Sequence, residues 1–297
     1  VKYGTPRENT LGLRAVSGHG KVLQTGVRTT KGVVGYDLTR LLLGSEGTLA
    51  IITEATLKLT PLAQSKRTLQ ATYRSIDAAA RAVSAIMAQA ITPCALEFMD
   101  GQAINMVRDY SDLELSANTQ AMLMIEVDGS AHAIDADAQQ LQQIAHNDGC
   151  LEVVLAQNDA EVAKLWRTRK ALSPALRTIA PKKINEDVVV PVAQLPALMS
   201  GLQALSTQHG ITIVNFGHAG NGNIHVNLLL DPDDPVQAKA AQACLADVFQ
   251  LVLSLGGTLS GEHGIGRVKR DFISQELDPH ALQLMQSIKQ QFDPDGI

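Results

Sequence analysis

The sequence predicts an α+β fold in which an antiparallel sheet carries helices on one face. Short apolar strands alternate with Ala-rich helices between residues 69 and 156, and this pattern occurs twice. The first half consists of LQATY, a helix over 77–90 and CALEFM; the second consists of AMLMIEV, a helix over 131–146 and CLEVVLA. Two such halves are typical of a ferredoxin-like sheet.

The first 62 residues differ from this pattern. They contain β segments punctuated by glycine, and DLTRLLLGSEGTLAIITEATLKLTP predicts a short helix, a glycine-rich loop and an apolar strand. We therefore expect one domain over residues 1–62 and a second over residues 63–297. A length of 297 residues agrees with two domains, each able to bury a core.

Composition excludes several classes of function. The formal net charge is −5 and the chain has no dense Lys/Arg stripe, which argues against nucleic acid or anionic lipid as a partner. No uninterrupted apolar run reaches the roughly 18 residues that a membrane helix needs. Cys94, Cys150 and Cys244 are far apart and odd in number, as expected of small buried side chains in a reducing compartment.

The stretch FGHAGNGNIHVN, residues 216–227, contains two histidines around an Asn-Gly pair. If residues 221–222 form a two-residue type I′ turn, His218 lies opposite His225 and Asn227 shares their side of the hairpin. Opposed residues have Cβ atoms roughly 4.5 to 5.5 Å apart, close enough for both imidazoles to bind one ion. Two structural histidines near a turn remain the alternative.

A third metal ligand is available in GGTLSGEHGIGR, residues 256–267. Glu262 and His263 stand between glycines, where the backbone can approach a ligand closely. A carboxylate with two imidazoles suits zinc, iron or manganese and leaves coordination positions open for a substrate. The alternative is a glycine-rich turn with an exposed Glu-His pair.

The loop in LLLGSEGTLAIIT exposes backbone N–H groups that can bind phosphate. It lacks the longer patterns of nucleotide-binding loops, so an ordinary turn is the alternative. In LWRTRKALSPALRTIAPKKINEDVVVP, Arg169 and Ser173 share one face of a predicted helix, and Lys182 and Lys183 follow. Arg169 could bind a carboxylate through two hydrogen bonds, although a solvated basic helix would have the same sequence.

Five stretches occur together in an order typical of one family. They are KYGTPRENTLGL, KGVVGYDLTRLLLGSEGTLAIITEATLKLTP, NEDVVVP, FGHAGNGNIHVN and SGEHGIGRVKRDF. With them the chain resembles the FAD-linked D-2-hydroxyacid dehydrogenases, which include cytochrome-linked D-lactate dehydrogenases, the flavin subunit of glycolate oxidase and D-2-hydroxyglutarate dehydrogenase. The resemblance covers essentially the whole chain. It implies that residues 1–62 are the C-terminal part of a two-part FAD-binding domain, and that residues 63–297 are a substrate- and metal-binding cap domain.

The resemblance also implies roles for individual residues. His218, His225 and Glu262 would hold a divalent metal, zinc first, with manganese or iron as alternatives. The catalytic and substrate-binding residues would be Arg169 for the carboxylate, Asn227 near the hydroxyl, His263 as general base, and Ser173 and Lys183. The FAD contacts would be Ser45, Glu46, Gly47, Thr48 and Ile52. Asn185 replaces a lysine that some members have, so cationic help would come from Lys182 or Lys183.

The implied reaction is FAD-dependent oxidation of a D-2-hydroxy acid to a 2-oxo acid. D-lactate is the first candidate, and glycolate and D-2-hydroxyglutarate are the others. We expect the chain alone to be inactive, because family members carry an N-terminal half of the flavin domain before its starting point. We expect a cytoplasmic location, with peripheral attachment to the inner membrane through the electron acceptor as the alternative. The acceptor itself (cytochrome, quinone or electron-transfer flavoprotein) is left open, as is a homodimer. A flavin-independent metal hydrolase, a non-haem metal enzyme and an inactive binding fragment are the alternatives.

Overall fold

The computed structural model describes residues 1–29, 31–108 and 115–297, apart from the side chains at 108, 173 and 177–179. The chain forms two compact units, one of Val1–Lys2 and Ala63–His263 and the other of Tyr3–Leu62 and Gly264–Ile297. The chain divides after Leu62, and the C-terminal segment from Gly264 groups with Tyr3–Leu62. The domain bounds 1–62 and 63–297 stay a prediction.

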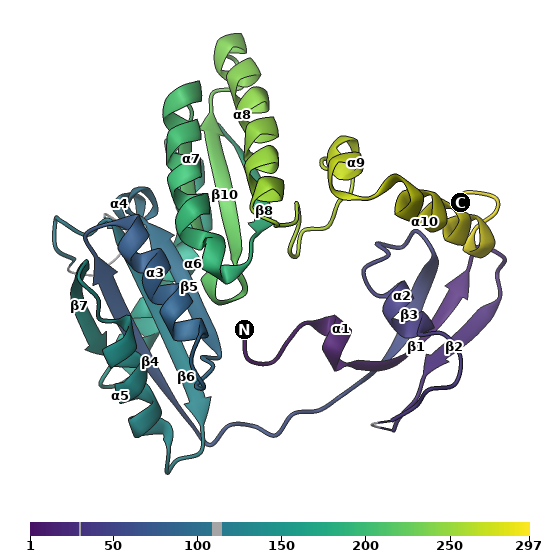
Figure 1. The fold of residues 1–297 in the computed structure, drawn as a ribbon, viewed down its shortest axis with the longest axis horizontal. Helices are drawn as coiled ribbons and strands as arrows, with labels where there is room; N and C mark the ends of the chain where they lie inside the picture. The colour runs from purple at the N-terminus through teal and green to yellow at the C-terminus, as the bar shows by residue number, and fades with distance from the viewer. Residues whose placement is uncertain (30, 109–114) are drawn as a thin grey trace. The chain divides into compact units, whose positions relative to one another are not determined.

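The larger unit is built on a seven-stranded sheet in the order β7-β4-β6-β5-β9-β10-β8, whose neighbouring strands are all antiparallel (Figure 1). Its strands are β4 (Ser65–Tyr73), β5 (Ala95–Asp100), β6 (Ala121–Gly129), β7 (Cys150–Leu155), β8 (Lys182–Val189), β9 (Thr212–His218) and β10 (Asn223–Leu230). Its helices are α3 (Ile76–Met87), α4 (Gly101–Arg108), α5 (Ile134–Ala145), α6 (Asp159–Ile179), α7 (Leu195–His209) and α8 (Pro235–Ser254), with short 3₁₀ turns η1 (Val192–Gln194) and η2 (Ala219–Asn221).

The first four strands confirm the ferredoxin-like prediction. They follow one another as β4-α3-β5, then β6-α5-β7, and lie in the order β7-β4-β6-β5. The helix α3 begins where the Ser75 hydroxyl accepts a hydrogen bond from the Ala78 N–H, and its small side chains at Ala79 and Ala82 are fully buried. Strands β9, β10 and β8 extend this sheet beyond β5, so the β9–β10 hairpin is paired on both sides, with β5 and with β8.

Helices cover both faces of the sheet. α3, α5, α7 and α8 pack on one face, where Phe98 and Ile224 lie among side chains of α3 and α7 (Figure 1). On the opposite face, Met99 and Phe216 form a buried cluster with side chains of α4 and α6. The helices expected on one face are therefore present, and α4 and α6 add a second layer that the sequence did not predict. The candidate site lies on this second face.

The smaller unit contains a three-stranded sheet in the order β2-β1-β3. Its elements are α1 (Pro6–Asn9), β1 (Thr10–Ser17), β2 (Val22–Gly26), α2 (Leu38–Leu42), β3 (Ala50–Leu57), η3 (Arg270–Phe272), α9 (Ile273–Glu276) and α10 (Pro279–Phe292). The C-terminal helix joins this unit because Ile288 and Phe292 pack against its small core, and the Gly18 N–H donates to the Phe292 carbonyl. Chain segments far apart in the sequence thus share one core.

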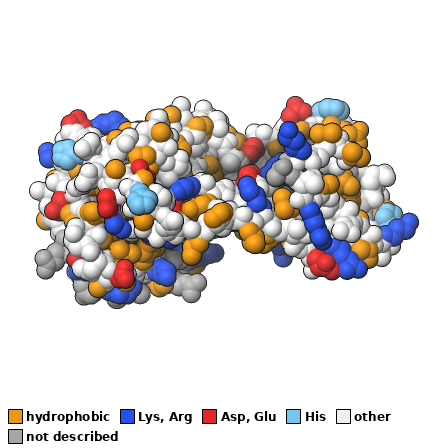
Figure 2. All heavy atoms as spheres, turned by 90° about the horizontal axis from the view of Figure 1, so that it is seen from below, with side chains coloured by type: hydrophobic (Ala, Val, Ile, Leu, Met, Phe, Trp, Pro, Cys, Tyr) orange, Lys and Arg blue, Asp and Glu red, His pale blue; other side chains and the backbone are white. Residues whose placement is uncertain are grey.

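The surface carries both signs of charge. On the face drawn in Figure 2, Lys and Arg side chains are interspersed with acidic and hydrophobic ones, and the described residues form no continuous basic strip there. This distribution agrees with the charge pattern of the sequence. In the described part of the chain, no helix combines the length and the apolar character needed to cross a membrane.

Candidate functional site

The β9–β10 hairpin brings the two histidines together, but in a different register from the one predicted. Asn223 is the partner of His218, and Phe216 is the partner of His225. The prediction that His218 lies directly opposite His225 is therefore wrong. Because the register differs by two residues and side chains alternate with a period of two, both imidazoles still project from one face, with ring centroids 5.5 Å apart.

The turn differs from a type I′ turn because only one of its residues is left-handed. Ala219–Asn221 forms the 3₁₀ turn η2, and within this loop Gly222 alone has a positive φ, 72°. A type I′ turn needs two such residues. A Cβ at Gly222 would also lie 1.9 Å from the Val190 carbonyl oxygen, so this position requires glycine for its space as well as its conformation.

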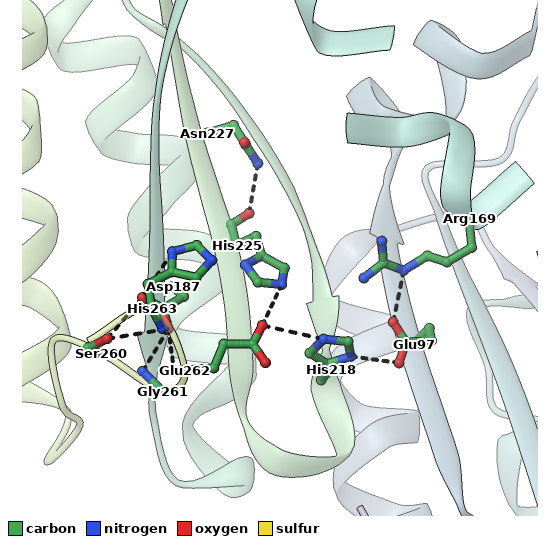
Figure 3. Close-up of polar contacts among 10 residues, drawn as sticks. All are labelled: Glu97, Arg169, Asp187, His218, His225, Asn227, Ser260, Gly261, Glu262 and His263. Atoms are coloured by element: carbon green, nitrogen blue, oxygen red, sulfur yellow. Dashed lines mark hydrogen bonds and ion pairs between the residues drawn. The ribbon is translucent and has the colours of Figure 1, made fainter. Parts of the chain in front are cut away.

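A buried aspartate holds the third ligand in place. Asp187 of β8 is fully buried and is the register partner of His225. Its Oδ2 accepts N–H groups from Gly261 at 2.9 Å, Glu262 at 2.5 Å and His263 at 2.7 Å, and its Oδ1 accepts the Ser260 hydroxyl at 3.1 Å. One carboxylate therefore binds the whole turn of the Gly-Glu-His stretch beside β10, as Figure 3 shows.

Glu262, His218 and His225 form a cluster of side chains of the kinds that could hold a metal ion. One ligand atom from each lies within 4.8 Å of the other two. Glu262 Oε1 is 3.2 Å from His225 Nε2 and 3.6 Å from His218 Nε2. Ligands about 2.0 to 2.2 Å from zinc in a tetrahedral site are separated by roughly 3.3 to 3.6 Å. The carboxylate oxygen and the two imidazole nitrogens are therefore spaced to share one ion with little movement.

The surroundings shift the pKa values of the two imidazoles in opposite directions. Burial lowers the pKa of His225 to about 4, and the neighbouring His218, His263 and Arg169 side chains act in the same direction. Its ring is therefore neutral at neutral pH, and a nitrogen lone pair is available. The hydrogen bond with Glu97 raises the pKa of His218. A more basic imidazole is a stronger metal ligand once its proton has left.

Arg169 is held beside the cluster by Glu97. The Arg169 Nε lies 2.8 Å from Glu97 Oε2, and its guanidinium carbon lies 5.0 Å from the centroid of the Phe216 ring. Burial alone would raise the pKa of Glu97, but the hydrogen bond from His218 and the charge of Arg169 together lower it. Figure 3 shows the terminal nitrogens of Arg169 turned toward the side of the imidazoles. Glu97 thus links the predicted carboxylate-binding residue to His218, a predicted metal ligand.

His263 stacks on His225 and faces a buried carboxylate. Its ring centroid is 5.3 Å from that of His225, with 22° between the ring planes. Its Nδ1 is 3.4 Å from Asp187 Oδ1. Because an ionised carboxylate only accepts hydrogen bonds, this contact favours the tautomer with the proton on Nδ1 and leaves Nε2 as the basic nitrogen.

Asn227 lies on the same face as the histidines but is fully buried. Its amide nitrogen donates to the carbonyl oxygens of Val214 and His225, both at 3.1 Å. Within the described part of the chain, its side-chain oxygen and that of its register partner Asn185 have no hydrogen-bond partner. The amide therefore stabilises the hairpin, and the contact with a substrate hydroxyl stays a prediction.

The remaining predicted substrate residues are less well defined. Ser173 lies on α6 with Arg169, but its side chain is outside the described residues. Lys183 pairs with Leu229, which belongs to the cluster on the site face, whereas Lys182 pairs with the next residue and points to the other face. Of the two lysines, the register therefore favours Lys183 as the one on the side of the site.

The predicted cofactor loop lies in the smaller unit and is a turn closed by its own contacts. The Ser45 hydroxyl donates to the Leu42 carbonyl, and the Thr48 hydroxyl donates to the Ser45 carbonyl. Glu46 has a φ of 53°, and Gly47 one of 75°. A surface cavity of about 420 Å³ lies in the same unit along residues 24–27 and 34–40. The predicted FAD residues, including the exposed Ile52, do not line this cavity, and their role stays a prediction.

Two functional side chains were missed by sequence reasoning. Glu97 is the only charged residue in the strand sequence CALEFM, and Asp187 is one of two in NEDVVVP. Both are buried, with 5% and 0% of their surface exposed. An acidic residue inside an apolar strand is rarely buried without a partner, so this pattern could have marked both positions.

Comparison with known proteins identifies the family. The profile described as FAD linked oxidases, C-terminal domain, matches residues 62–297. The chain belongs to this family. It is 36% identical over 297 residues to the glycolate oxidase subunit GlcD of Bacillus subtilis, covering 100% of this chain and 63% of that protein. It is 31% identical over 299 residues to a probable mitochondrial D-lactate dehydrogenase of Danio rerio, covering 99% of this chain and 60% of that protein.

A solved structure supports the fold of this family member. p-Cresol methylhydroxylase with substrate bound superposes with a TM-score of 0.74 at 14% identity, over 97% of this chain and 63% of that chain. At this identity the likeness concerns the fold alone. The chain thus spans about 60% of the length of the curated relatives described above.

Proposed function

We propose that this chain provides the metal and substrate site of an FAD-dependent dehydrogenase that oxidises a D-2-hydroxy acid to the 2-oxo acid. The observation that carries the proposal is the convergence of a two-histidine, one-glutamate cluster, a guanidinium and a further imidazole on one face of the sheet. The names of the relatives, a glycolate oxidase subunit and a D-lactate dehydrogenase, support this substrate class. D-lactate is the first candidate, with glycolate and D-2-hydroxyglutarate as the others.

His218, His225 and Glu262 would hold a divalent ion, zinc first and manganese or iron as alternatives. The fit rests on their spacing and on the neutral state of His225. Three protein ligands leave open positions, and a metal there would supply the positive charge that lowers the pKa of a bound hydroxyl group. A 2-hydroxy acid offers a hydroxyl and a carboxylate oxygen on adjacent carbons, which suits such an open site.

Arg169 would bind and orient the substrate carboxylate. Its Nε is engaged with Glu97 and its plane rests on Phe216, so its terminal N–H groups are the donors that remain for a ligand. A carboxylate fixed at this point defines which face of the α-carbon is presented. The selection of one enantiomer follows from that orientation.

His263 would take the hydroxyl proton on its Nε2. Asp187 stabilises the positive charge that the ring then acquires, and it holds the loop that carries the ring. When bound, FAD supplies the acceptor for the α-hydrogen and its electron pair, chemistry that side chains alone cannot provide. The cavity of about 420 Å³ in the smaller unit is of a size that accommodates part of such a cofactor.

A flavin-independent metal hydrolase is the second candidate. The observation that favours it is that the two-histidine, one-carboxylate cluster is complete without any predicted flavin contact. The visible absorption of flavin in a full-length protein that carries this chain separates the two candidates. A colourless, metal-loaded protein that hydrolyses esters would support the hydrolase.

The test of the proposed function uses that full-length protein under anaerobic conditions. D-2-hydroxy acids should bleach the bound flavin, L enantiomers should do so much more slowly, and a chelator should suppress the bleaching. Added zinc or manganese should restore it. If flavin is bound but none of D-lactate, glycolate and D-2-hydroxyglutarate reduces it, the proposed substrate class is wrong.

A further inference from the structure

The two carboxylate oxygens of Glu97 contact two residues with different predicted roles, the metal ligand His218 and the carboxylate-binding residue Arg169. Oε1 lies 2.8 Å from His218 Nδ1, and Oε2 lies 2.8 Å from Arg169 Nε (Figure 3). The side chain extends from β5, the strand next to β9, and is buried. No residue of the family resemblance corresponds to it, yet it contacts both a metal ligand and the carboxylate-binding residue.

For His218, Glu97 decides which ring nitrogen can bind a metal. Glu97 Oε1 lies 2.8 Å from the His218 Nδ1, and a carboxylate oxygen accepts hydrogen bonds, so the Nδ1 of the ring carries the proton. The lone pair is then on Nε2, the atom that lies 3.6 Å from Glu262 Oε1. Carboxylates in this position fix the tautomer and orientation of a ligating imidazole and strengthen it as a donor.

For Arg169, Glu97 fixes the plane of the guanidinium. The Nε contact and the stacking on Phe216, at 5.0 Å, restrain the group from two directions. Only 13% of the Arg169 side chain is exposed, so few other rotamers are open to it. The same carboxylate therefore sets where the terminal N–H groups stand relative to His218.

We propose that Glu97 is a positioning residue that couples metal binding to binding of the substrate carboxylate. The proposal rests on the proposed function, since it takes His218 as a metal ligand and Arg169 as the carboxylate-binding residue. An ion bound at His218 Nε2 would make the Nδ1–H of the ring a stronger hydrogen-bond donor to Glu97. The negative charge of the Glu97 carboxylate would then be drawn toward His218, and its attraction for Arg169 would weaken. By thermodynamic linkage, a substrate carboxylate on Arg169 then changes the affinity of the metal by the same factor.

The test uses the 297-residue chain and Co²⁺, whose visible absorption reports its ligands. Glu97→Gln keeps the size of the side chain, but an amide has only one accepting oxygen. If that oxygen accepts from His218, the NH₂ group faces the Arg169 N–H, and two donors then oppose each other. We expect the variant to bind Co²⁺ about 10- to 100-fold more weakly, with a shifted absorption band. We also expect glycolate, added to the Co²⁺-loaded chain, to bind more weakly and to alter the band less.

Glu126→Gln is the matched control. Glu126 lies on the same sheet, is 7% exposed and pairs with Lys66, but the structure gives it no contact with His218 or Arg169. This variant should hold Co²⁺ and glycolate within twofold of the wild type. If Glu97→Gln also binds Co²⁺ within twofold and has an unchanged band, Glu97 is only a structural ion pair and the coupling is wrong.

A second variant covers the case in which Glu97→Gln does not fold. Arg169→Gln removes the other partner of Glu97 and no metal ligand, so a shifted Co²⁺ band in this variant supports the shared carboxylate and an unchanged band contradicts it. The wild type separates this inference from the proposed function. If the wild type takes up no Co²⁺, the metal site is absent and both fail; if it does, the variants test the coupling alone.

Discussion

Two carboxylates hold the two halves of the SGEHGIG stretch, and they do so in opposite surroundings. Asp187 in the larger unit is fully buried and accepts three backbone N–H groups from residues 261–263. Glu46 in the smaller unit is exposed and accepts the N–H groups of Ile265 and Gly266, at 2.8 and 3.0 Å. The same kind of contact is thus made once away from water and once in it.

The difference shows where the candidate site obtains its rigidity. A hydrogen bond to a buried charge cannot be replaced by water, so losing it leaves both groups unsatisfied. An exposed carboxylate gives up its partners at little cost, because water takes their place. We therefore expect the residues that define metal geometry to depend on Asp187, and the Gly-Ser-Glu-Gly-Thr loop to behave as an ordinary turn.

The largest effect is expected for Asp187→Asn. An amide cannot accept three backbone N–H groups and a hydroxyl at once, so the free energy of unfolding should fall by about 3 to 5 kcal/mol. The chain should also lose most of its affinity for zinc, because Glu262 is no longer fixed. Urea unfolding and chelator competition measure both. The control is Asp135→Asn, whose side chain is 68% exposed; equal losses in the two variants would show that burial is not the cause.

Asp100 extends the comparison to a buried carboxylate away from the metal ligands. Burial raises its pKa to about 6 in spite of hydrogen bonds from Ala103 and Asn215. Because the folded-state pKa lies above the ordinary value of 3.8, the contribution of Asp100 to stability is fully present below pH 3.8 and is lost as the pH rises through 6. Relative to Asp100→Asn, the wild type should lose about 2 kcal/mol of unfolding free energy between pH 4 and 7. A pH-independent difference between the two proteins would contradict the raised pKa.

Arg169→Lys tests the site that Asp187 and Glu97 support. A lysine has no second N–H group in a fixed plane, so it cannot hold Glu97 and orient a substrate carboxylate as the guanidinium does. In the full-length protein, kcat/KM for 2-hydroxy acids should fall about 10- to 200-fold, equivalent to about 1.5 to 3 kcal/mol. Thermal unfolding checks that the fold is retained. Unchanged kinetics would show that Arg169 serves only as the structural partner of Glu97.

The smallest effect is expected for Glu46→Gln. The amide still accepts one N–H group, and water can satisfy the other, so the unfolding free energy should change by about 1 kcal/mol or less. The affinity for zinc should stay within twofold of the wild type. A loss of metal as large as that of Asp187→Asn would show that both halves of the stretch support the site, and the contrast between them would disappear.

The sequence predicted the metal cluster better than it predicted the hairpin. His218 and His225 were placed on one face although the turn type was wrong, because a register shift of two preserves the face. The four strands of the ferredoxin-like half were found from alternating apolar segments and Ala-rich helices. These features depend on local patterns, which a single sequence displays.

Most features that depend on long-range contacts were not predicted, and the approach of Glu262 to the two histidines was expected only from the family resemblance. Glu97 and Asp187 act on residues 72 to 121 positions away in the chain, and nothing in the local pattern names those partners. The packing of α10 in the N-terminal unit was missed for the same reason, because Phe292 packs against core residues between positions 13 and 50. Sequence periodicity gives the face of an element, whereas its neighbours follow from the packing of the whole chain.

The metal content of the chain tests the central claim most directly. Purified without chelators and equilibrated with zinc, the wild type should retain a single divalent ion through desalting, because three donor atoms lie within 4.8 Å of one another. His225→Ala removes one donor and should retain almost none, while His132→Ala, at an exposed position, should retain as much as the wild type. Equal metal content in the wild type and His225→Ala would contradict the account, and the two histidines would then be ordinary residues of the hairpin.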